Sequence, residues 1–376
     1  MSGNKIKLIM YYIKYGLSFF IGWFFIVPLS GLIPKKKNQI LFIGTNEGLF
    51  IDNVKYLFIY LYNLKHEGKE FYFLTENKKV FNELKEKNLP VVLYPSLSGI
   101  YVLLRTSVLI VDTYWWYTNL KYYFLFYTCK IQMWHGVGFK LIGQEQFKIL
   151  STCERYFKKI IHILGGLNVT YDLFVSTSAF YTTNVFSKAF KYKDVIEAGY
   201  PRNDCFFMEL DEMLLIGTDK EKINKVKEFK NNGYKIVIYV PTFSRTGRDP
   251  LMDGALDIRK LNDMAEKYKI LFIFKFHPNP RYKYEVSELK HIIEYDNHKD
   301  VYPLLPLTDL MITDYSSIYT DYLFLDKPVL FFPYDFQHYL EKDGNFQFDY
   351  DWITPGPKCK NYDDLEHEII TCLVEG

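Results

Sequence analysis

The sequence predicts an α/β protein built from two domains, each with a mostly parallel β-sheet. Short apolar runs alternate with helical patterns, which is typical of parallel sheets covered by helices on both faces. The alternation breaks at Gly199-Tyr200-Pro201-Arg202-Asn203-Asp204 and then resumes. A length of 376 residues suits two domains plus an appendage, since domains usually contain roughly 100–200 residues. We therefore expect an N-terminal segment (1–38), a first domain (39–205) and a second domain (206–376).

Composition and charge exclude several classes of protein. The hydrophobic fraction of 49% is enough for a sizeable core, and the net charge of +2 gives no basis for nucleic-acid binding. The five cysteines are odd in number and lack C-x-x-C spacing, which argues against a disulfide scaffold or zinc ribbon and favours a reducing compartment. No P-loop or G-x-S-x-G elbow is present.

The N-terminal stretch has the composition of a membrane-associated segment. No charged residue occurs from Tyr15 to Pro34, and lysines flank this stretch on both sides. Pro28 and Gly31 interrupt it, so we expect an unbroken helix of only about 20 Å against a hydrocarbon core of about 30 Å. We favour a helix lying in the cytoplasmic face of a membrane, with its lysines on anionic head groups. A single transmembrane span and a buried core helix are the alternatives.

The first domain is expected to contain seven strands, at Gln39–Ile43, Glu70–Leu74, Val91–Tyr94, Val108–Val111, Lys130–Met133, Leu173–Val175 and Val195–Ala198. Helices are expected at Asp52–Tyr62, Lys78–Lys87, Ser96–Leu104, Ser151–Leu164 and near Phe180–Phe190. His135 follows the strand Lys130–Met133 and precedes two glycines, which allow a backbone or a ligand to come close. The alternative for this histidine is a packed, hydrogen-bonded core residue. Arg202 lies at the domain boundary, where it is either solvated or able to pair with a phosphate.

The second domain repeats this architecture. Strands are expected at Lys235–Tyr239, Lys269–Phe276, Leu310–Ile312 and Val329–Phe332, and helices at Lys220–Lys230, Leu261–Tyr268, Val301–Leu305 and Ile318–Leu325. Three of the strands end at polar residues, namely Thr242, His277 and the turn Asp314–Ser317. Because the carboxyl ends of parallel strands line one edge of a sheet, these residues are expected to form a site.

The turn before Ile318 has two candidate roles. The helix N-terminus and the hydroxyl groups of Ser316 and Ser317 suit a phosphate group. Serine is also a common helix N-cap, which is the alternative. Farther on, Asp349-Tyr350-Asp351 formally matches a metal-binding Asp-x-Asp, but Pro355-Gly356-Pro357 follow, so we expect a loop with solvated carboxylates and no metal site.

Five motifs occur in a fixed order: WHGVGFK (134–140), GYPRND (199–204), PTF (241–243), FKFHP (274–278) and TDYSSIYTDYLFLDKPVLFF (313–332). Together they resemble the CDP-glycerol glycerophosphotransferase family, whose members build teichoic acids and related capsular polymers at the inner membrane face of bacteria. The resemblance covers roughly residues 39 to 370 and includes the late segment FQFDYDWITPGP. It implies a GT-B architecture, with two Rossmann-like domains facing a cleft, an acceptor-side first domain and a second domain that holds the CDP-linked donor.

The resemblance also implies roles for individual residues. His135 and His277 correspond to the family's two essential histidines. Donor contacts are implied for Gly136, Val137, Gly138, Phe139, Arg202, Pro241, Thr242, Lys275, Phe276, Ser316, Ser317 and Asp321. Val137-Gly138 departs from the family, which more usually has Thr-Pro at these positions.

The chemistry that we expect is attack by an acceptor hydroxyl on the glycerol-bearing phosphorus of CDP-glycerol, with release of CMP. His135, with a pKa near the usual value of about 6.5, would act as the general base. His277 and Arg202 would stabilise the charge on the pyrophosphate, and the Ser316-Ser317 turn would hold the leaving phosphate. Because so many fixed hydrogen-bond donors would face the phosphates, no metal or other cofactor is expected to be obligatory.

The expected partners are CDP-glycerol, a lipid-linked saccharide acceptor and a membrane surface. The lack of a further large domain favours a primase, which adds one glycerol phosphate, over a polymerase. Three alternatives stay open: a CDP-ribitol phosphotransferase, a GT-B glycosyltransferase that uses a nucleotide sugar, and a non-catalytic, membrane-tethered binding subunit.

Overall fold

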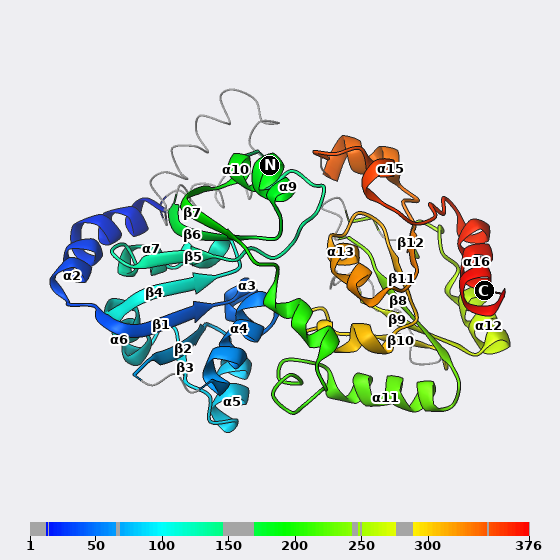
Figure 1. Ribbon diagram of the computed structural model, residues 1–376, viewed down its shortest axis with the longest axis horizontal. Coiled ribbons are helices and arrows are strands. Elements are labelled where there is room, and N and C mark those ends of the chain that lie inside the picture. Colours follow the sequence, from blue (N-terminus) through cyan, green and yellow to red (C-terminus); the bar gives the residue numbers. More distant parts are fainter. Residues whose placement is uncertain are drawn as a thin grey trace. The chain divides into compact units, whose positions relative to one another are not determined.

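The computed structural model describes residue 13 and residues 15–64, 68–145, 169–242, 247–248, 250–275, 289–343 and 346–375. The chain divides into two compact units, the first made of Met1–His135 and Ile142–Arg202, the second of Gly136–Leu141 and Asn203–Gly376. The division falls at Arg202, where the sequence suggested Cys205, and it assigns the short segment Gly136–Leu141 to the second unit. The described part of each unit contains one parallel sheet (Figure 1).

The sheet of the first unit has the strand order β3-β2-β1-β4-β5-β6-β7, and all described pairs are parallel. The strands are β1 (Lys36–Ile43), β2 (Glu70–Thr75), β3 (Val91–Leu93), β4 (Thr106–Val111), β5 (Cys129–Gln132), β6 (Thr170–Ser176) and β7 (Lys191–Glu197). All seven strands expected from the sequence are present. The direction in which strands are added reverses between β1 and β4, and open α/β sheets bind ligands at such a reversal.

Two helices of the first unit begin at capping residues that the sequence offers. The described helices after the N-terminal one include α3 (Thr45–Gly48), α4 (Asp52–Asn63), α5 (Lys78–Glu86), α6 (Leu97–Arg105), α7 (Lys121–Phe124), α9 (Ala179–Tyr181) and α10 (Ser187–Ala189). Asn77 caps α5 by accepting from the Lys79 and Val80 amides, and Ser96 caps α6. The expected helix at Ser151–Leu164 lies outside the described residues.

An aromatic cluster joins helix α4 to the sheet. Phe58 of α4 lies edge-on to Phe42 of β1 and Phe73 of β2, with ring centroids 5.3 and 5.9 Å apart. Phe50 completes the cluster at 4.9 Å from Phe73. All four rings are essentially inaccessible to solvent, so they fix the position at which α4 begins.

The N-terminal helix is longer than the sequence suggested. It runs through a π-helical turn (Gly22–Ile26) into α2 (Val27–Leu32), and Tyr15–Leu32 is continuous and has a mean hydropathy of 1.6. The expected break at Pro28 is wrong, because the backbone stays helical from the π-helical turn through this proline to Leu32. The 18 residues rise about 27 Å, so by length and composition alone the helix can cross a membrane.

One face of this helix packs on the first unit. The ring of Trp23 lies 5.2 Å from that of Phe126, and the Ser30 hydroxyl donates to the Phe124 carbonyl at 2.8 Å. Large side chains on the rest of the helix are exposed: Leu17, Phe20, Ile21, Phe24, Phe25, Leu29 and Leu32. Lys35 and Lys36 were expected to contact head groups, but the Lys35 ammonium donates to the Leu104 carbonyl at 2.9 Å and Lys36 pairs with Glu70.

The sheet of the second unit has the order β10-β9-β8-β11-β12, again with parallel pairs throughout its described strands. The strands are β8 (Lys235–Val240), β9 (Ile270–Phe274), β10 (Ile292–Glu294), β11 (Leu310–Thr313) and β12 (Val329–Phe331). The reversal lies between β8 and β11. Helices α12 (Ile258–Tyr268) and α16 (Tyr362–Ile370) contribute Leu261, Met264, Leu365 and Ile369 to the core over these strands.

Several elements of the second unit differ from the sequence expectations. The strand β10 and the helix α16 were not predicted. The expected helix Val301–Leu305 is a 3-10 helix (Tyr302–Leu307) that contains two prolines, and the expected loop around Asp349 includes α15 (Tyr350–Ile353). The remaining described helices are α11 (Lys220–Asn231), α13 (Ile318–Tyr322) and α14 (Phe336–His338).

The docking of the N-terminal helix predicts unequal effects of two neighbouring substitutions. Trp23→Ala should lower the free energy of unfolding by about 2 kcal/mol, less than the roughly 3–5 kcal/mol of a fully buried tryptophan. Phe24, which is 63% exposed, should tolerate alanine within about 0.5 kcal/mol. Thermal unfolding of both variants in the same detergent checks this, and equal stabilities would contradict the packing of Trp23.

Candidate functional site

In the first unit, His135 is held at the end of strand β5 by a hydrogen bond to the neighbouring strand. Its Nδ1 lies 2.6 Å from the carbonyl oxygen of Asp112, which directly follows β4. A carbonyl oxygen only accepts, so Nδ1 carries the proton and the neutral ring has an unprotonated Nε2. The geometry therefore assigns the tautomer of His135.

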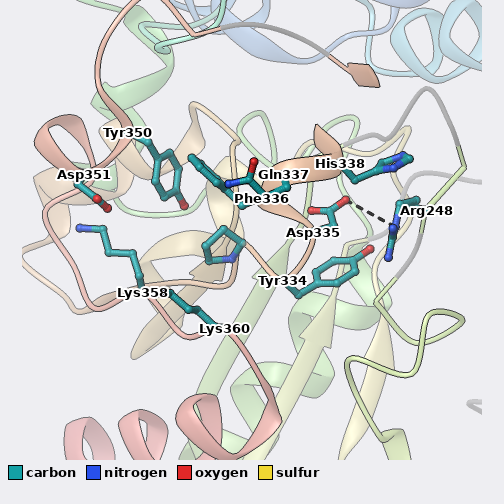
Figure 2. A pocket seen from close by; sticks show the side chains of 11 residues that line it. Arg248, Tyr334, Asp335, Phe336, Gln337, His338, Tyr350, Asp351, Lys358 and Lys360 are labelled. Carbon is teal, nitrogen blue, oxygen red and sulfur yellow. Dashed lines mark ion pairs between the residues drawn. The ribbon is translucent and has the colours of Figure 1, made fainter. Parts of the chain in front are cut away.

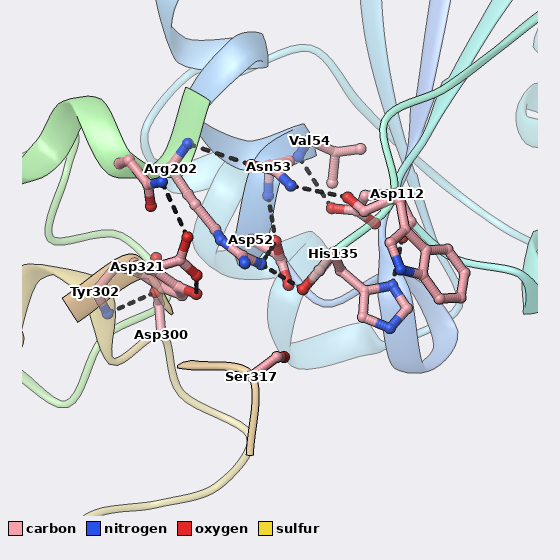
Figure 3. A network of polar contacts seen from close by, with 12 residues as sticks. Asp52, Asn53, Val54, Asp112, His135, Arg202, Asp300, Tyr302, Ser317 and Asp321 are labelled. Carbon is pink, nitrogen blue, oxygen red and sulfur yellow. Dashed lines mark hydrogen bonds and ion pairs between the residues drawn. The ribbon is translucent and has the colours of Figure 1, made fainter. Parts of the chain in front are cut away.

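The backbone on both sides of the imidazole is fixed by a second set of contacts, shown in Figure 3. The Arg202 guanidinium donates through Nη1 to the His135 carbonyl oxygen at 2.7 Å and to Asp52 Oδ1 at 2.6 Å. The Asn53 amide donates to the Trp134 carbonyl at 2.8 Å and accepts from the Arg202 backbone amide at 3.3 Å. Trp134 has a φ of 59°, a conformation that costs free energy and is held by these bonds.

Burial sets the charge state of this cluster. The pKa of the Asp112 carboxyl is raised well above its usual range, first by burial and then by the nearby Asp52 charge. The pKa of His135 is lowered from its usual 6.5, mainly because burial disfavours the imidazolium, and Arg202 adds to the effect while Asp52 opposes it. The sequence expectation of an ordinary pKa is therefore corrected, and the neutral imidazole is favoured at neutral pH.

Sequence reasoning missed Asp52, Asn53 and Asp112. Asp112 carries a signal like the one that identified His135, a polar residue at the carboxyl end of a buried strand, and could have been found in this way. Asp52 and Asn53 begin α4, which follows β1 at the reversal of the sheet. The pairing of Asp52 with Arg202 had no signal, because the two residues are 150 positions apart.

Arg202 is 2% exposed, and its described contacts hold the chain around His135. Its guanidinium also lies over the Tyr200 ring, 4.9 Å from the centroid. These contacts make Arg202 a positioning residue in the described structure, and its contact with a phosphate stays a prediction.

In the second unit, the expected meeting of polar residues at the sheet edge is present where β8 and β11 end. The Thr242 amide donates to both carboxylate oxygens of Asp314, at 2.8 and 3.0 Å. The Lys140 ammonium donates to the Thr242 hydroxyl at 3.1 Å. Burial raises the pKa of Asp314, and the Lys140 charge opposes this shift. Pro241 and Thr242 thus lie beside the turn that contains Ser316 and Ser317.

The two glycines after His135 allow a close backbone approach, as the sequence suggested. A side chain on Gly136 would lie 2.7 Å from the Ser317 hydroxyl oxygen, and one on Gly138 would lie 3.0 Å from Ser317 Cβ. Phe139 is fully buried, 4.8 Å from the Phe346 ring, and the Gln347 amide donates to its carbonyl at 2.7 Å. The Phe139 side chain therefore anchors this segment in the core of the second unit, and its contact with a donor stays a prediction.

The turn Ser316-Ser317 differs from a simple helix cap. Ser317 precedes α13, but its side chain does not bond to the helix amides, so the N-cap interpretation is wrong for this hydroxyl. No hydrogen bond from either serine hydroxyl reaches another described residue. Helix α13 is also short, with five residues, so the hydroxyl groups are the main polar feature of the turn.

The other predicted residues of the second unit have internal partners. The Lys275 ammonium donates to the carbonyls of Asp296 and Lys299 at 3.1 and 3.0 Å, and burial lowers its pKa to about 8. Asp321 accepts from Asn203 at 2.9 Å and from the Tyr302 hydroxyl at 2.8 Å. Phe276 and His277 lie outside the described residues.

A cavity of about 620 Å³ lies beyond the end of β12, with the basic side chains Arg248, Lys358 and Lys360 in its wall (Figure 2). Asp351 also lines it, whereas Asp349 caps α15 by accepting from the Trp352 amide at 2.9 Å. Within the described ranges, no group of three His, Cys, Asp or Glu side chains is close enough to hold a metal ion.

Comparison with known proteins places these features in a family. A sequence profile described as CDP-Glycerol:Poly(glycerophosphate) glycerophosphotransferase matches residues 26–376. The "Teichoic acid poly(glycerol phosphate) polymerase" of Bacillus subtilis (strain 168) is 25% identical over 91% of this chain, but only 45% of that relative is covered. The "Teichoic acid glycerol-phosphate primase" of the same strain is 28% identical over 77% of this chain and 70% of its own length.

The "Teichoic acid ribitol-phosphate primase" of Bacillus spizizenii (strain ATCC 23059 / NRRL B-14472 / W23) is 25% identical, with 91% of this chain and 84% of the relative covered. Among solved structures, the wall teichoic acid polymerase TagF superimposes with a TM-score of 0.70 at 21% identity, covering 99% of this chain and 89% of that chain. The likeness confirms the expected fold class, an α/β protein of the GT-B type with two parallel-sheet domains.

The network around His135 predicts that Arg202 contributes strongly to stability. Arg202→Ala should cost about 3–5 kcal/mol, because it leaves the partly buried Asp52 without its counter-charge. Arg248→Ala is the matched control, since its pair with Asp253 is more exposed and should cost less than about 1 kcal/mol. Denaturant unfolding measures both, and a smaller loss for Arg202 than for Arg248 would contradict the network.

Proposed function

We propose that this chain, which belongs to the CDP-glycerol:poly(glycerophosphate) glycerophosphotransferase family, transfers glycerol phosphate from CDP-glycerol to a hydroxyl group of a lipid-linked saccharide acceptor. Family membership and the teichoic acid names of the relatives support a role as a transferase in teichoic acid synthesis. The observation that carries the proposal is the assigned tautomer of His135, because it supplies a neutral, oriented base.

The reaction requires one proton to leave the acceptor. The acceptor oxygen forms a bond to the glycerol-bearing phosphorus, the bond from that phosphorus to the CMP oxygen breaks, and Nε2 of His135 takes the hydroxyl proton. Proton transfer to a positioned base contributes about 10²–10⁴-fold to a rate. The lowered pKa keeps the imidazole unprotonated near neutral pH, and the proton on Nδ1 holds the ring while Nε2 changes its charge.

The negative charge that develops on the leaving CMP has to be stabilised by hydrogen-bond donors of the protein. In the second unit, Ser316 and Ser317 follow β11, which pairs with β8. Thr242 follows β8, and the Lys140 ammonium donates to its hydroxyl, so hydroxyl and ammonium groups occur at one sheet edge. His277, outside the described residues, keeps its predicted role on the pyrophosphate. Preorganised donors of this kind stabilise charge without reorganisation during the reaction.

The donor and the product length have named alternatives among the relatives. Glycerol-phosphate and ribitol-phosphate transferases both match at 25–28% identity, as do primases and polymerases. We propose a primase that uses CDP-glycerol, in wall teichoic acid or capsular polymer synthesis. CDP-ribitol is the second candidate, because a ribitol-phosphate primase is matched over 84% of its length.

We also propose that the N-terminal helix lies in the cytoplasmic face of the membrane. The packing of Trp23 on Phe126 and the Ser30 bond keep one face of the helix on the first unit. A helix held in this way leaves its other face, which carries Phe24 and Leu32, for the acyl chains. A surface location of the helix also suits an acceptor that is itself anchored in lipid.

The role of His135 predicts a large loss of turnover on substitution. His135→Ala should reduce acceptor-dependent release of CMP from CDP-glycerol by about 10²–10⁴-fold, since no other base is oriented by the Asp112 carbonyl. His367→Ala, on the exposed surface of α16, is the control and should retain normal turnover. CDP-ribitol and a UDP-sugar are assayed in parallel. Near-normal turnover of the folded His135 variant would refute the assignment of the base.

The lowered pKa of His135 predicts the acidic limb of the pH profile. Because the base must be unprotonated, log kcat/KM should fall as the pH drops through the folded-state pKa, and this pKa lies below 6.5. At pH 6.5 more than half of the base should therefore be unprotonated, and more than half of the maximal activity should remain. Steady-state rates across this range check the direction, and a limb centred above 6.5 would contradict it.

A further inference from the structure

A second cavity lies in the first unit, at the edge of the sheet where β1, β2 and β4 end. We propose that it binds an uncharged sugar ring of the acceptor; this rests on the proposed function and assigns a binding site to the saccharide part of its second substrate. Its walls include Glu47, Glu76, Thr113, Trp115 and Asn119, and its volume is about 240 Å³. At about 30 Å³ per water molecule this is room for roughly eight waters, which suits one sugar ring better than a nucleotide.

Two consecutive residues, Asp112 and Thr113, contact His135 and the cavity respectively. Thr113 lines the cavity, and Asp112, the residue before it, holds His135 Nδ1 through its carbonyl. The Gln132 side chain donates to the Thr113 carbonyl at 3.2 Å and accepts from the Trp134 amide at 2.9 Å. The ends of β4 and β5 therefore position both the general base and one wall of the cavity. A ligand in this cavity lies at the same edge of the sheet as His135.

Two neighbouring tryptophans behave differently at this edge. Trp116 is 1% exposed, and its indole N–H donates to the Tyr171 hydroxyl at 3.2 Å, which anchors the 3-10 turn Trp115–Tyr117. Trp115 is 61% exposed and lines the cavity. An indole face that is open to solvent and rigidly mounted suits the apolar C–H face of a sugar, which loses contact with water on stacking.

The loop opposite Trp115 is held in an unfavourable conformation. Asn46 and Glu47 have φ values of 46° and 63°, each of which costs a non-glycine residue about 1–2 kcal/mol. A hydrogen bond from the Glu76 amide to the Glu47 carbonyl, at 2.8 Å, and the close packing of Gly48 on the Leu74 carbonyl keep the loop in place. The exposed side chains of Asn46 and Glu47 are thereby presented at the cavity. Such strain is typical of binding sites.

The charge of the cavity distinguishes a hydroxyl-rich ligand from a phosphate. Glu76 is neutralised by its ion pair with Lys121 and accepts from the Asn119 side chain at 2.5 Å. Glu47 adds a second carboxylate, and its side chain makes no hydrogen bond to another described residue. The excess of negative charge repels a phosphodiester, whereas carboxylate and amide groups accept from and donate to sugar hydroxyls. The cavity is thus suited to the saccharide part of an acceptor and unsuited to a polyanionic chain.

Equilibrium binding without a donor tests the proposal independently of catalysis. The probe is an uncharged N-acetylhexosamine disaccharide on a short alkyl chain, titrated into the full-length protein by calorimetry. Trp115→Ala should weaken binding by about tenfold, the value of one lost aromatic contact. Trp352→Ala is the control, since Trp352 is equally exposed, at 64%, but belongs to the second unit. Equal affinities of wild type and Trp115→Ala, or no binding to wild type, would overturn the proposal.

The charge argument is tested with a phosphorylated form of the same probe. The wild type should bind it about tenfold more weakly than the uncharged form, and Glu47→Gln should reduce this difference by at least about threefold. Tighter binding of the phosphorylated probe by wild type would overturn the assignment to an uncharged sugar. If binding depends on Trp115 while no donor releases CMP, the sugar site stands and the proposed transfer fails.

Discussion

The hydrogen bond between His135 Nδ1 and the Asp112 carbonyl oxygen determines what the imidazole can do. It exists because β4 and β5 are parallel neighbours whose carboxyl ends lie at one edge of the sheet, so that the residues following them meet. A carbonyl acceptor holds the ring without placing a full negative charge beside it. A carboxylate in the same place would raise the pKa of the ring through its charge. The histidine is therefore oriented and still neutral, which are the two properties that a general base needs near neutral pH.

The other contacts of the first unit maintain this bond. Arg202 donates to the His135 carbonyl and Asn53 donates to the Trp134 carbonyl. These hydrogen bonds offset the free-energy cost of the positive φ at Trp134. Asp52 keeps the Arg202 charge compensated, and the buried Asp112 carboxyl has a raised pKa that limits its negative charge beside the ring. The lowered pKa of His135 is thus the result of burial together with a nearby arginine.

Much of the architecture could be predicted from the sequence, because buried parallel strands are short apolar runs with polar residues at their carboxyl ends. This pattern located His135, Thr242 and the Asp314–Ser317 turn. The three-residue strand β10 was missed because so short a run carries little periodicity. The helix through Pro28 was missed because the π-helical turn that precedes this proline is not visible in the residue pattern.

The pairings between distant parts of the chain had no sequence signal. Asp52 meets Arg202 across 150 positions, and Phe139 packs against Phe346, which lies more than 200 positions farther along the chain. The pKa of His135 also depends on burial, which the sequence around it does not specify. Such features arise from tertiary packing, and local residue patterns do not encode them.

The tautomer of His135 is the most direct measurement of the central claim. Nitrogen-15 NMR of histidine-labelled protein at neutral pH, with the His135 signals assigned by difference from His135→Gln, distinguishes protonated from unprotonated ring nitrogens. The account predicts a neutral ring with the proton on Nδ1 and a free Nε2. A proton on Nε2, or an imidazolium at neutral pH, would contradict the bond to Asp112 and with it the assignment of the general base.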